Sequence, residues 1–177
     1  KGTASYALTY KRDDAKVHFY GHADADWAGE DETAKSTTGV GFSGGSGLLS
    51  WKASTQPIVT HSSTEAELVA LDSATRELEF LRQVALDFGL KVELPVPMLQ
   101  DNLSTIRIVE SGRFSSRTRH LNVRYHYTHD LVKDGVVRIQ KINTKFIPSD
   151  ALTKALGSKD HERHALVLLG MAAIEGV

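Results

Sequence analysis

The first third of the chain carries the hydrophobic pattern of β-strands. Residues 16–21 (KVHFYG) are rich in β-branched and aromatic side chains, which favour a strand. Residues 39–42 and 48–51 flank the run SGGSG at 43–47, so we expect them to pair as a β-hairpin. The sequence therefore predicts three antiparallel strands before any helix.

A long helical pattern follows these strands. Ser62 and Thr64 each precede a glutamate by three residues, as in the capping box that begins many helices. Gly89 provides the stop signal. Between them, apolar side chains recur at helical spacing at Leu71, Ala74, Leu78, Leu81, Ala85 and Phe88. One face of this helix should therefore pack against the sheet.

The second half of the chain alternates between the two patterns. Strands are predicted at residues 95–100 and 136–142, and helices at 101–109, at 119–133, from Ser149 onwards and at 159–169. The order β-β-β-α-β-α-α-β-α-α indicates an α/β fold, in which helices flank a mixed sheet.

Four acidic residues stand where elements begin or end. Asp24 and Asp101 each follow a predicted strand. Glu67 lies in the first turns of the long helix, and Asp150 in the first turn of a later one. Ligand chemistry in α/β proteins gathers at strand ends, and carboxylates suit Mg²⁺ or Mn²⁺. Taken singly, Asp24 and Asp101 fit turn or N-cap positions as well, and Asp150 fits a plain helix start.

The orientation of Glu67 is the best evidence for a site. At about 100° per residue, Glu67 falls within about 60° of the apolar positions of its helix, whereas Glu65 lies about 160° away, toward solvent. A carboxylate that faces the core is costly unless it is paired, hydrogen-bonded or bound to a metal. The alternative is that Glu67 only caps its own helix through Thr64.

Composition narrows the possible functions. The 177 residues include no cysteine, which excludes a disulfide scaffold, a thiolate zinc site and a cysteine nucleophile. No apolar run approaches the length of a membrane span, so no membrane partner is expected. With 21 Lys and Arg against 22 Asp and Glu, the net charge of -1 argues at first against a nucleic-acid-binding protein.

The charges are, however, unevenly distributed. No acidic residue lies between Glu110 and Asp130, and basic residues there are interleaved with aromatic ones, as on a surface that follows phosphates. We expect Arg117, Arg119 and Arg124 to contact phosphates, and the alternative for each is an internal salt bridge. The acidic residues at the ends of elements are thus separate from the basic stretch between Glu110 and Asp130.

Four other side chains are expected in the core. Tyr125 and Leu121 belong to the predicted helix at 119–133. Trp27 and Trp51 could stack on a sugar or a base, but packing in the core is favoured.

Seven short runs of the sequence occur together. They are HADADWAGE (22–30), STTG (36–39), LSW (49–51), SSTEAELVAL (62–71), LQDN (99–102), SRTRHLNVRYH (116–126) and SDALTKAL (149–156). In this order and spacing they resemble the ribonuclease H domain of copia-type LTR retrotransposons, which ends the reverse transcriptase part of the polyprotein. The resemblance extends from about Leu8 to Met171, and SSTEAE with the later DN and RTRH is its most specific part.

This resemblance implies the ribonuclease H fold, a five-stranded mixed sheet with its three antiparallel strands first and helices flanking it. It also implies an enzyme that hydrolyses the RNA strand of RNA/DNA hybrids with two Mg²⁺ ions, for which Mn²⁺ can substitute, leaving 5′-phosphate and 3′-hydroxyl ends. Carried over residue by residue, the catalytic and metal-binding acids are Asp24, Glu67, Asp101 and Asp150. Candidates for contacting the 2′-hydroxyl are Asn102, Gln100 and backbone amides.

Two neighbouring acids compete with this assignment. Asp26 shares the motif of Asp24, which we prefer because it lies nearer to the predicted strand end, and Glu65 competes with Glu67. One stretch departs from the family, since residues 143–149 contain no histidine, where many ribonucleases H carry a mobile one. Product release or proton delivery would then depend on another group, such as Lys145 or water.

The resemblance also implies how the chain is organised. Residues 1–12 would be a linker from the polymerase connection, 13–171 the ribonuclease H domain, and 172–177 a C-terminal tail. The expected partners are an RNA/DNA hybrid and the polymerase domain of the same polyprotein, in the cytoplasm within a virus-like particle. The rival hypotheses are a non-catalytic ribonuclease H-like connector or hybrid-binding module, and an integrase core, whose last acid is a glutamate.

Overall fold

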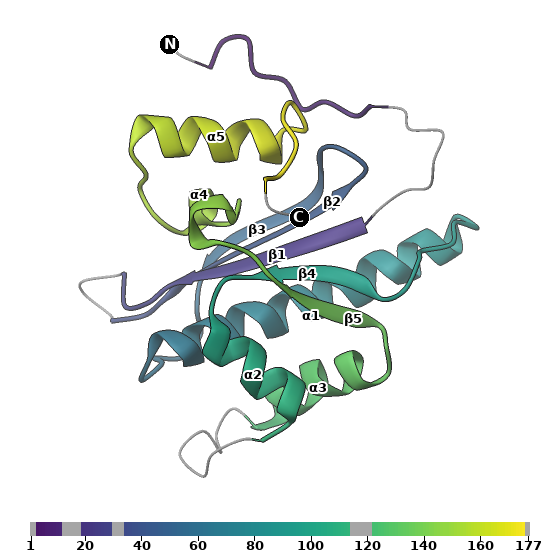
Figure 1. The fold of residues 1–177 in the computed structure, drawn as a ribbon, viewed down its shortest axis with the longest axis vertical. Coiled ribbons are helices and arrows are strands. Elements are labelled where there is room, and N and C mark those ends of the chain that lie inside the picture. The colour runs from purple at the N-terminus through teal and green to yellow at the C-terminus, as the bar shows by residue number, and fades with distance from the viewer. Residues whose placement is uncertain (1–2, 12–18, 30–33, 114–121, 176–177) are drawn as a thin grey trace.

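The computed structural model describes residues 3–11, 19–29, 34–113 and 122–175 (Figure 1). Within these ranges five strands form one mixed sheet in the order β3-β2-β1-β4-β5. The strands are β1 (Phe19–Asp26), β2 (Thr37–Gly44), β3 (Leu48–Thr55), β4 (Val96–Gln100) and β5 (Val137–Lys141). The first three pair antiparallel, and β4 and β5 run parallel to β1. The predicted mixed sheet is therefore confirmed.

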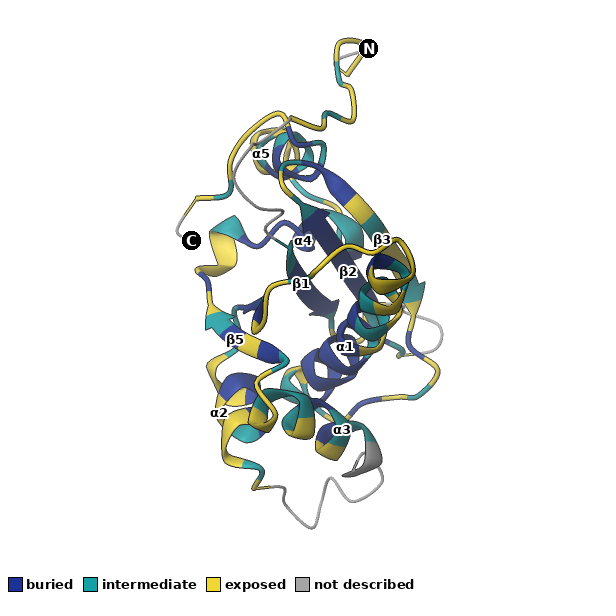
Figure 2. Cartoon of the chain, turned by 90° about the vertical axis from the view of Figure 1, so that its right-hand side faces the viewer, coloured by how far each residue is buried: buried dark blue, intermediate teal, exposed yellow. Residues whose placement is uncertain are grey.

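Helices cover both faces of this sheet (Figures 1 and 2). On one face, α1 (Ser63–Asp87) packs on β1 and β2, and α2 (Leu103–Ser111) and α3 (Asn122–Lys133) pack beside it. On the other face, the short α4 (Asp150–Thr153) packs on β1 and β2 and is followed by α5 (Ser158–Leu168). A 3₁₀ turn, η2 (Thr144–Phe146), leads into α4. No helix in the described ranges has the length and apolarity that a membrane crossing requires.

The main core lies between the sheet and α1. Val40 and Phe42 of β2 are buried in one cluster with Leu71 and Leu78 of α1. Tyr125 of α3 joins this cluster with 1% of its surface exposed, as predicted. Residue 121, which was also expected in the core, lies outside the described residues. The alternation of strand residues thus places one face of β2 on the apolar stripe of α1.

A variant of the capping box fixes the start of α1, in which Glu65 accepts a hydrogen bond from the residue before the N-cap Ser62. Ser62 Oγ accepts a hydrogen bond of 3.2 Å from Glu65 N, and Glu65 Oε2 accepts one of 2.8 Å from His61 N. Glu65 is consequently buried. The prediction that it points to solvent is wrong, because the cap folds its carboxylate back toward the residues before the helix.

Two predicted boundaries differ in the structure. β1 continues to Asp26 through its pairing with β2, so Asp24 lies within the strand, opposite Gly39, rather than after it. At the other end of α1, Phe88 is 78% exposed, because the helix ends beyond the strands (Figure 1). The apolar stripe of α1 therefore stops short of its predicted last position.

Trp27 and Trp51 are 47% and 60% exposed, so the prediction that both pack in the core is wrong. Trp27 Nε1 donates a hydrogen bond of 3.2 Å to Thr60 O, which holds the indole at the surface. Trp51 lies on β3, the edge strand of the sheet, where a side chain has a neighbouring strand on one side only.

Candidate active site

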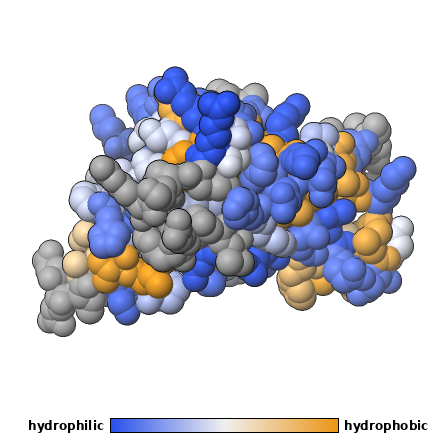
Figure 3. All heavy atoms as spheres, turned by 90° about the horizontal axis from the view of Figure 1, so that it is seen from below, coloured by the Kyte–Doolittle hydropathy of each residue, from blue (hydrophilic) through white to orange (hydrophobic). Residues whose placement is uncertain are grey.

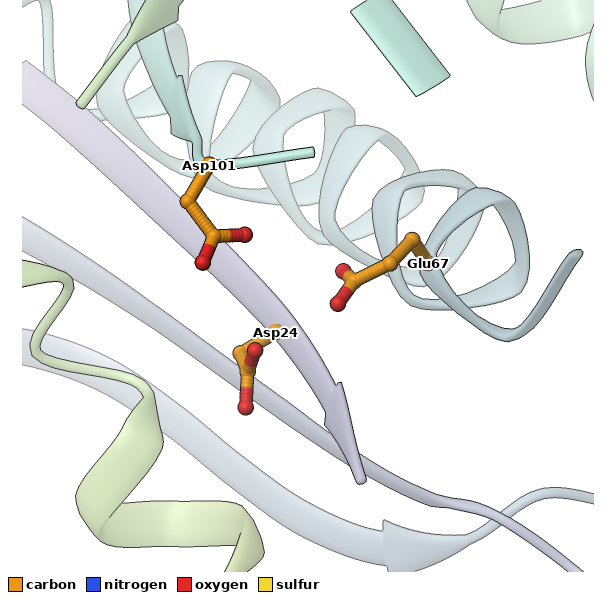
Figure 4. A group of neighbouring side chains, drawn as sticks. All are labelled: Asp24, Glu67 and Asp101. Carbon is orange, nitrogen blue, oxygen red and sulfur yellow. The ribbon is translucent and has the colours of Figure 1, made fainter. Parts of the chain in front are cut away.

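Three acidic side chains from different elements meet at one end of the sheet (Figure 4). Asp24 lies on β1, Glu67 on α1, and Asp101 directly after β4. One carboxylate oxygen of each lies within 4.8 Å of those of the other two. Two of these residues are buried, and Asp101 is partly exposed. The acid on the apolar face of α1, the acid after β4 and an acid within β1 thus converge on a single cluster.

The two competing acids are occupied elsewhere. The carboxylate of Asp26 lies against Gly29, in the turn that follows β1. Glu65 belongs to the capping box at the start of α1. The geometry therefore brings together the acid that we preferred from each pair, Asp24 and Glu67.

Gln100, the last residue of β4, connects two of the clustered acids. Its Nε2 donates a hydrogen bond of 3.3 Å to Glu67 Oε2, and its Oε1 accepts one of 2.7 Å from Asp101 N. The same oxygen accepts a bond of 2.9 Å from Asn102 N. Since Gln100 is fully buried, this amide fixes Glu67 relative to the chain that carries Asp101. From the sequence, Gln100 was expected only as a candidate contact to the 2′-hydroxyl.

Asn102 has a structural role at the start of α2. Its Oδ1 accepts hydrogen bonds of 2.9 Å from Ser104 N and 3.1 Å from Thr105 N, as an N-cap residue does. A contact between Asn102 and a 2′-hydroxyl stays a prediction. The amide nitrogen, which the cap does not use, is the group that would donate to it.

The fourth predicted acid, Asp150, lies near Asp24 on the face of the sheet opposite α1. It is the first residue of α4 and is buried. Thr153 Oγ1 donates a hydrogen bond of 2.5 Å to Asp24 Oδ2. Lys154 Nζ lies 2.8 Å from Asp150 Oδ1 and 3.7 Å from Asp24 Oδ2. Asp150 therefore adjoins the cluster of three, and a lysine connects it to Asp24.

Three buried acids at the site, Glu67, Asp24 and Asp150, have pKa values that burial raises. Burial raises the pKa of Glu67 to about 9, and the charges of Asp24 and Asp101 act in the same direction. Burial also raises the pKa values of Asp24 and Asp150, while Lys154 lowers both. The hydrogen bonds around these carboxylates therefore do not fully offset the cost of their negative charges. A bound proton or cation would neutralise that charge.

The donor set fits a hard divalent cation. Asp24, Glu67 and Asp101 offer only carboxylate oxygens, which are the ligands that Mg²⁺ and Mn²⁺ favour. Their spread of 4.8 Å lets one cation contact all three. The raised pKa values of Glu67 and Asp24 add a physical reason for cation binding, because the charged forms are unfavourable without one.

The structure describes one of the three arginines that we predicted to contact phosphates. Arg124 Nε lies 3.9 Å from Asp72 Oδ2. Arg76 Nε donates to both oxygens of the same carboxylate, at 3.2 and 3.1 Å. Arg117 and Arg119 lie outside the described residues. Arg124 therefore forms the internal ion pair that we considered as the alternative and stays partly exposed, while its contact with a phosphate stays a prediction.

Arg124 borders a cavity of about 250 Å³ beside α1. Lys52 and Ser54 of β3 line it, as do Arg76 and Asp72 of α1. Three cations against one carboxylate favour an anionic ligand such as a phosphate. The surface on the side of α2 and α3 is largely hydrophilic, with small apolar groups between (Figure 3). Arg76 and Asp72 could not be predicted from the sequence, because their proximity to Arg124 depends on how α3 packs on α1.

The chain is homologous to part of much longer proteins, although no protein-family model matches it. The retrovirus-related Pol polyprotein from transposon TNT 1-94 of Nicotiana tabacum is 33% identical over 156 residues, 88% of this chain and 12% of that protein. The corresponding polyprotein from transposon RE1 of Arabidopsis thaliana is 28% identical over 155 residues, 88% of this chain and 10% of that protein. The chain thus spans 10–12% of the length of these relatives.

Solved ribonucleases H share the fold. LC11-RNase H1, isolated from compost by a metagenomic approach, matches with a TM-score of 0.56 at 15% identity, over 77% of this chain and 93% of that one. The same enzyme in complex with an RNA/DNA hybrid matches with a TM-score of 0.55 at 16% identity, over 76% and 93%. The predicted ribonuclease H fold is therefore confirmed.

Proposed function

We propose that this chain, which has the ribonuclease H fold and is homologous to a segment of the Pol polyproteins of plant copia-type transposons, hydrolyses the RNA strand of RNA/DNA hybrids. The observation that carries the proposal is the meeting of Asp24, Glu67 and Asp101 within 4.8 Å. A connector that only joins domains has no need of clustered acids whose burial is costly. A metal-dependent nuclease does need them.

The proposed chemistry uses carboxylates that are oriented before the substrate arrives. Two divalent cations, Mg²⁺ or in its place Mn²⁺, would be held by Asp24, Glu67, Asp101 and Asp150. When bound, such cations activate water and neutralise charge at the scissile phosphate. Gln100 and Thr153 fix the two buried acids of the cluster by hydrogen bonds. Cleavage would leave 5′-phosphate and 3′-hydroxyl ends.

The proposed substrate is an RNA/DNA hybrid. A ribonuclease H with this fold has been solved in complex with such a hybrid, which supports the same class of substrate here. The cationic cavity bordered by Arg124 would contact a phosphate, and Arg117 and Arg119 are proposed to contact others. RNA is distinguished from DNA by its 2′-hydroxyl, for which Asn102 is the proposed partner.

The longer relatives support a place beside a polymerase. We infer that residues 13–171 form the ribonuclease H domain, joined through residues 1–12 to the polymerase domain of the same polyprotein and followed by a tail at 172–177. Such a domain would act during reverse transcription, in the cytoplasm within a virus-like particle. The homology of the chain to part of the Pol polyproteins supports this arrangement.

A cleavage assay tests the proposal. The chain is incubated with a labelled RNA/DNA hybrid, beside RNA/RNA and DNA/DNA duplexes, with Mg²⁺ or with EDTA. We expect cleavage of the hybrid's RNA strand alone, only with Mg²⁺, and none by Asp101→Asn. Binding of the hybrid by the wild type without cleavage would contradict the nuclease and favour the non-catalytic module.

A further inference from the structure

Lys154 is the cation nearest to the predicted metal site in the described part of the chain. It follows α4 directly, and its Nζ lies 2.8 Å from Asp150 Oδ1 and 3.7 Å from Asp24 Oδ2. The side chain is 34% exposed. A lysine that only paired along its own helix would have Asp150 as its sole partner, since the two are separated by four residues. The contact with Asp24 of β1 joins it to the site.

The position of Lys154 is fixed by its backbone. Lys154 N donates a hydrogen bond of 3.2 Å to Asp150 O, which closes the single turn of α4. The preceding residue, Thr153, is held by its hydroxyl bond to Asp24. The ammonium group is therefore directed between Asp24 and Asp150, two of the four acids that the proposed function assigns to metal binding.

Between Asp24 and Asp150, the ammonium group of Lys154 provides the positive charge that a bound divalent cation would otherwise provide. The two cannot occupy the same space, and their like charges repel. Among Asp24, Glu67 and Asp101, the ion pairs described for Lys154 include only Asp24, at 3.7 Å, which is the longer of its two contacts. Asp150 has Lys154 against one of its oxygens. The two sides of the site thus differ in the metal-free protein.

We propose that Lys154 is a positioning residue that holds Asp24 and Asp150 together in the metal-free protein and competes with the divalent cation that these two acids would share. The inference rests on the proposed function, because it assumes that all four acids serve metal binding. It makes cation binding ordered. The first cation binds at Asp24, Glu67 and Asp101, and the second binds only when Lys154 moves aside.

Calorimetric titration of the chain with Mn²⁺ and with Mg²⁺ at about pH 8 tests this order without substrate. Lys154→Met removes the charge and keeps much of the side-chain volume. We expect its weaker cation-binding step to tighten by about tenfold, since a like charge about 4 Å away is removed and solvent screens this charge only in part. Lys154→Arg keeps the charge and should bind like the wild type. Lys133→Met, at the exposed end of α3, is the control and should change nothing.

The outcomes separate this inference from the proposed function. A wild-type chain that binds no divalent cation would overturn both. If the wild type binds cations but Lys154→Met binds them with unchanged or lower affinity, the competition is refuted while the nuclease proposal stands. Tightening in the Met variant together with wild-type affinity in the Arg variant supports the proposal. Circular dichroism confirms that each variant is folded, and Lys154→Gln gives the same test should the Met variant fail to fold.

Discussion

Thr153 Oγ1 donates a hydrogen bond of 2.5 Å to Asp24 Oδ2, across 129 positions of the sequence. The bond forms only because α4 lies very close to the sheet. Beneath α4 stands Gly39 of β2, the pairing partner of Asp24. A Cβ atom at Gly39 would lie 2.7 Å from Thr153 Cγ2 and 2.9 Å from Leu152 Cβ. The absence of a side chain at Gly39 therefore sets the distance between Asp24 and the helix that carries Asp150.

We predict that Gly39→Ala weakens both the fold and the site. The added methyl group would push α4 away from β2, and overpacking of this kind costs about 1–3 kcal/mol. The melting temperature should fall by about 3–10 °C, as measured by differential scanning calorimetry. Cleavage of the hybrid should fall by at least about tenfold, because Asp150 and Thr153 move with the helix.

Gly157→Ala is the matched control for this change. A Cβ atom at Gly157, directly before α5, would meet nothing within 4 Å. We expect a melting temperature within about 2 °C of the wild type and unchanged cleavage. A Gly39→Ala variant that behaved like this control would show that the spacing of α4 does not govern the site.

Asp101→Asn should abolish cleavage and leave the fold intact. The substitution keeps the size of the side chain and removes one of the clustered carboxylates, so the rate should drop by at least about 10²–10³-fold. Removing one negative charge relieves repulsion, so the melting temperature in EDTA should be equal or higher. Asp134→Asn, in the exposed turn before β5, is the control and should cleave normally. Near-normal activity of the Asp101 variant would exclude it from the metal site.

The pKa of Glu67 predicts how the stability of the metal-free protein depends on pH. Burial raises this pKa from 4.5 to about 9. Between these values the folded state keeps a proton that the unfolded state has lost, so the free energy of unfolding falls as the pH rises. This stabilising contribution is complete below about pH 4.5 and is lost as the pH passes through 9.

Glu67→Gln removes that titration. In EDTA at about pH 8, we expect the variant to be more stable than the wild type by about 1–2 kcal/mol, or about 2–6 °C in melting temperature. The gain should vanish near pH 4. Glu110→Gln on the exposed side of α2 should follow the wild type throughout. A Glu67→Gln variant with no gain at pH 8 would mean that the carboxylate is already compensated in the metal-free protein.

The sequence could predict Glu67 but not the role of Glu65. Helical periodicity places Glu67 on the apolar face, and it does reach the cluster. The same geometry sends Glu65 to solvent, yet its carboxylate turns back to His61 N. Periodicity gives the direction of the Cα–Cβ bond, whereas the end of a long side chain follows local hydrogen bonds, which a regular helical pattern leaves out.

Contacts between elements that are far apart in the sequence could not be predicted either. Gln100 joins Glu67 to Asp101 only because the packing of α1 on β1 brings Glu67 close to the end of the neighbouring strand β4. Likewise, Asp24 lies inside β1 because β2 pairs with it as far as Asp26, and the apolar content of residues 16–21 could not show how far the pairing extends. The order of elements depends on local patterns and was predictable. The exposure of Phe88 depends on where the sheet ends, so it could not be predicted from a local pattern.

Arg124→Ala should weaken the binding of an RNA/DNA hybrid in a salt-dependent way. If Arg124 contacts a phosphate, its loss removes about one unit from the slope of log affinity against log salt. We expect the affinity at low salt to fall by about three- to tenfold. Fluorescence anisotropy measures both quantities, with Asp101→Asn in the background of every variant so that the hybrid stays uncut.

Two controls decide whether Arg124 acts on the substrate or only on Asp72. Arg138→Ala removes an exposed arginine from β5, the edge strand far from the cavity in the order of the sheet, and should leave the slope unchanged. Asp72→Asn removes the internal partner of Arg124, so an arginine that serves the hybrid should then bind it at least as well. An Arg124→Ala variant with a lower melting temperature but an unaltered salt slope would assign this residue to the pairing of α3 with α1 alone.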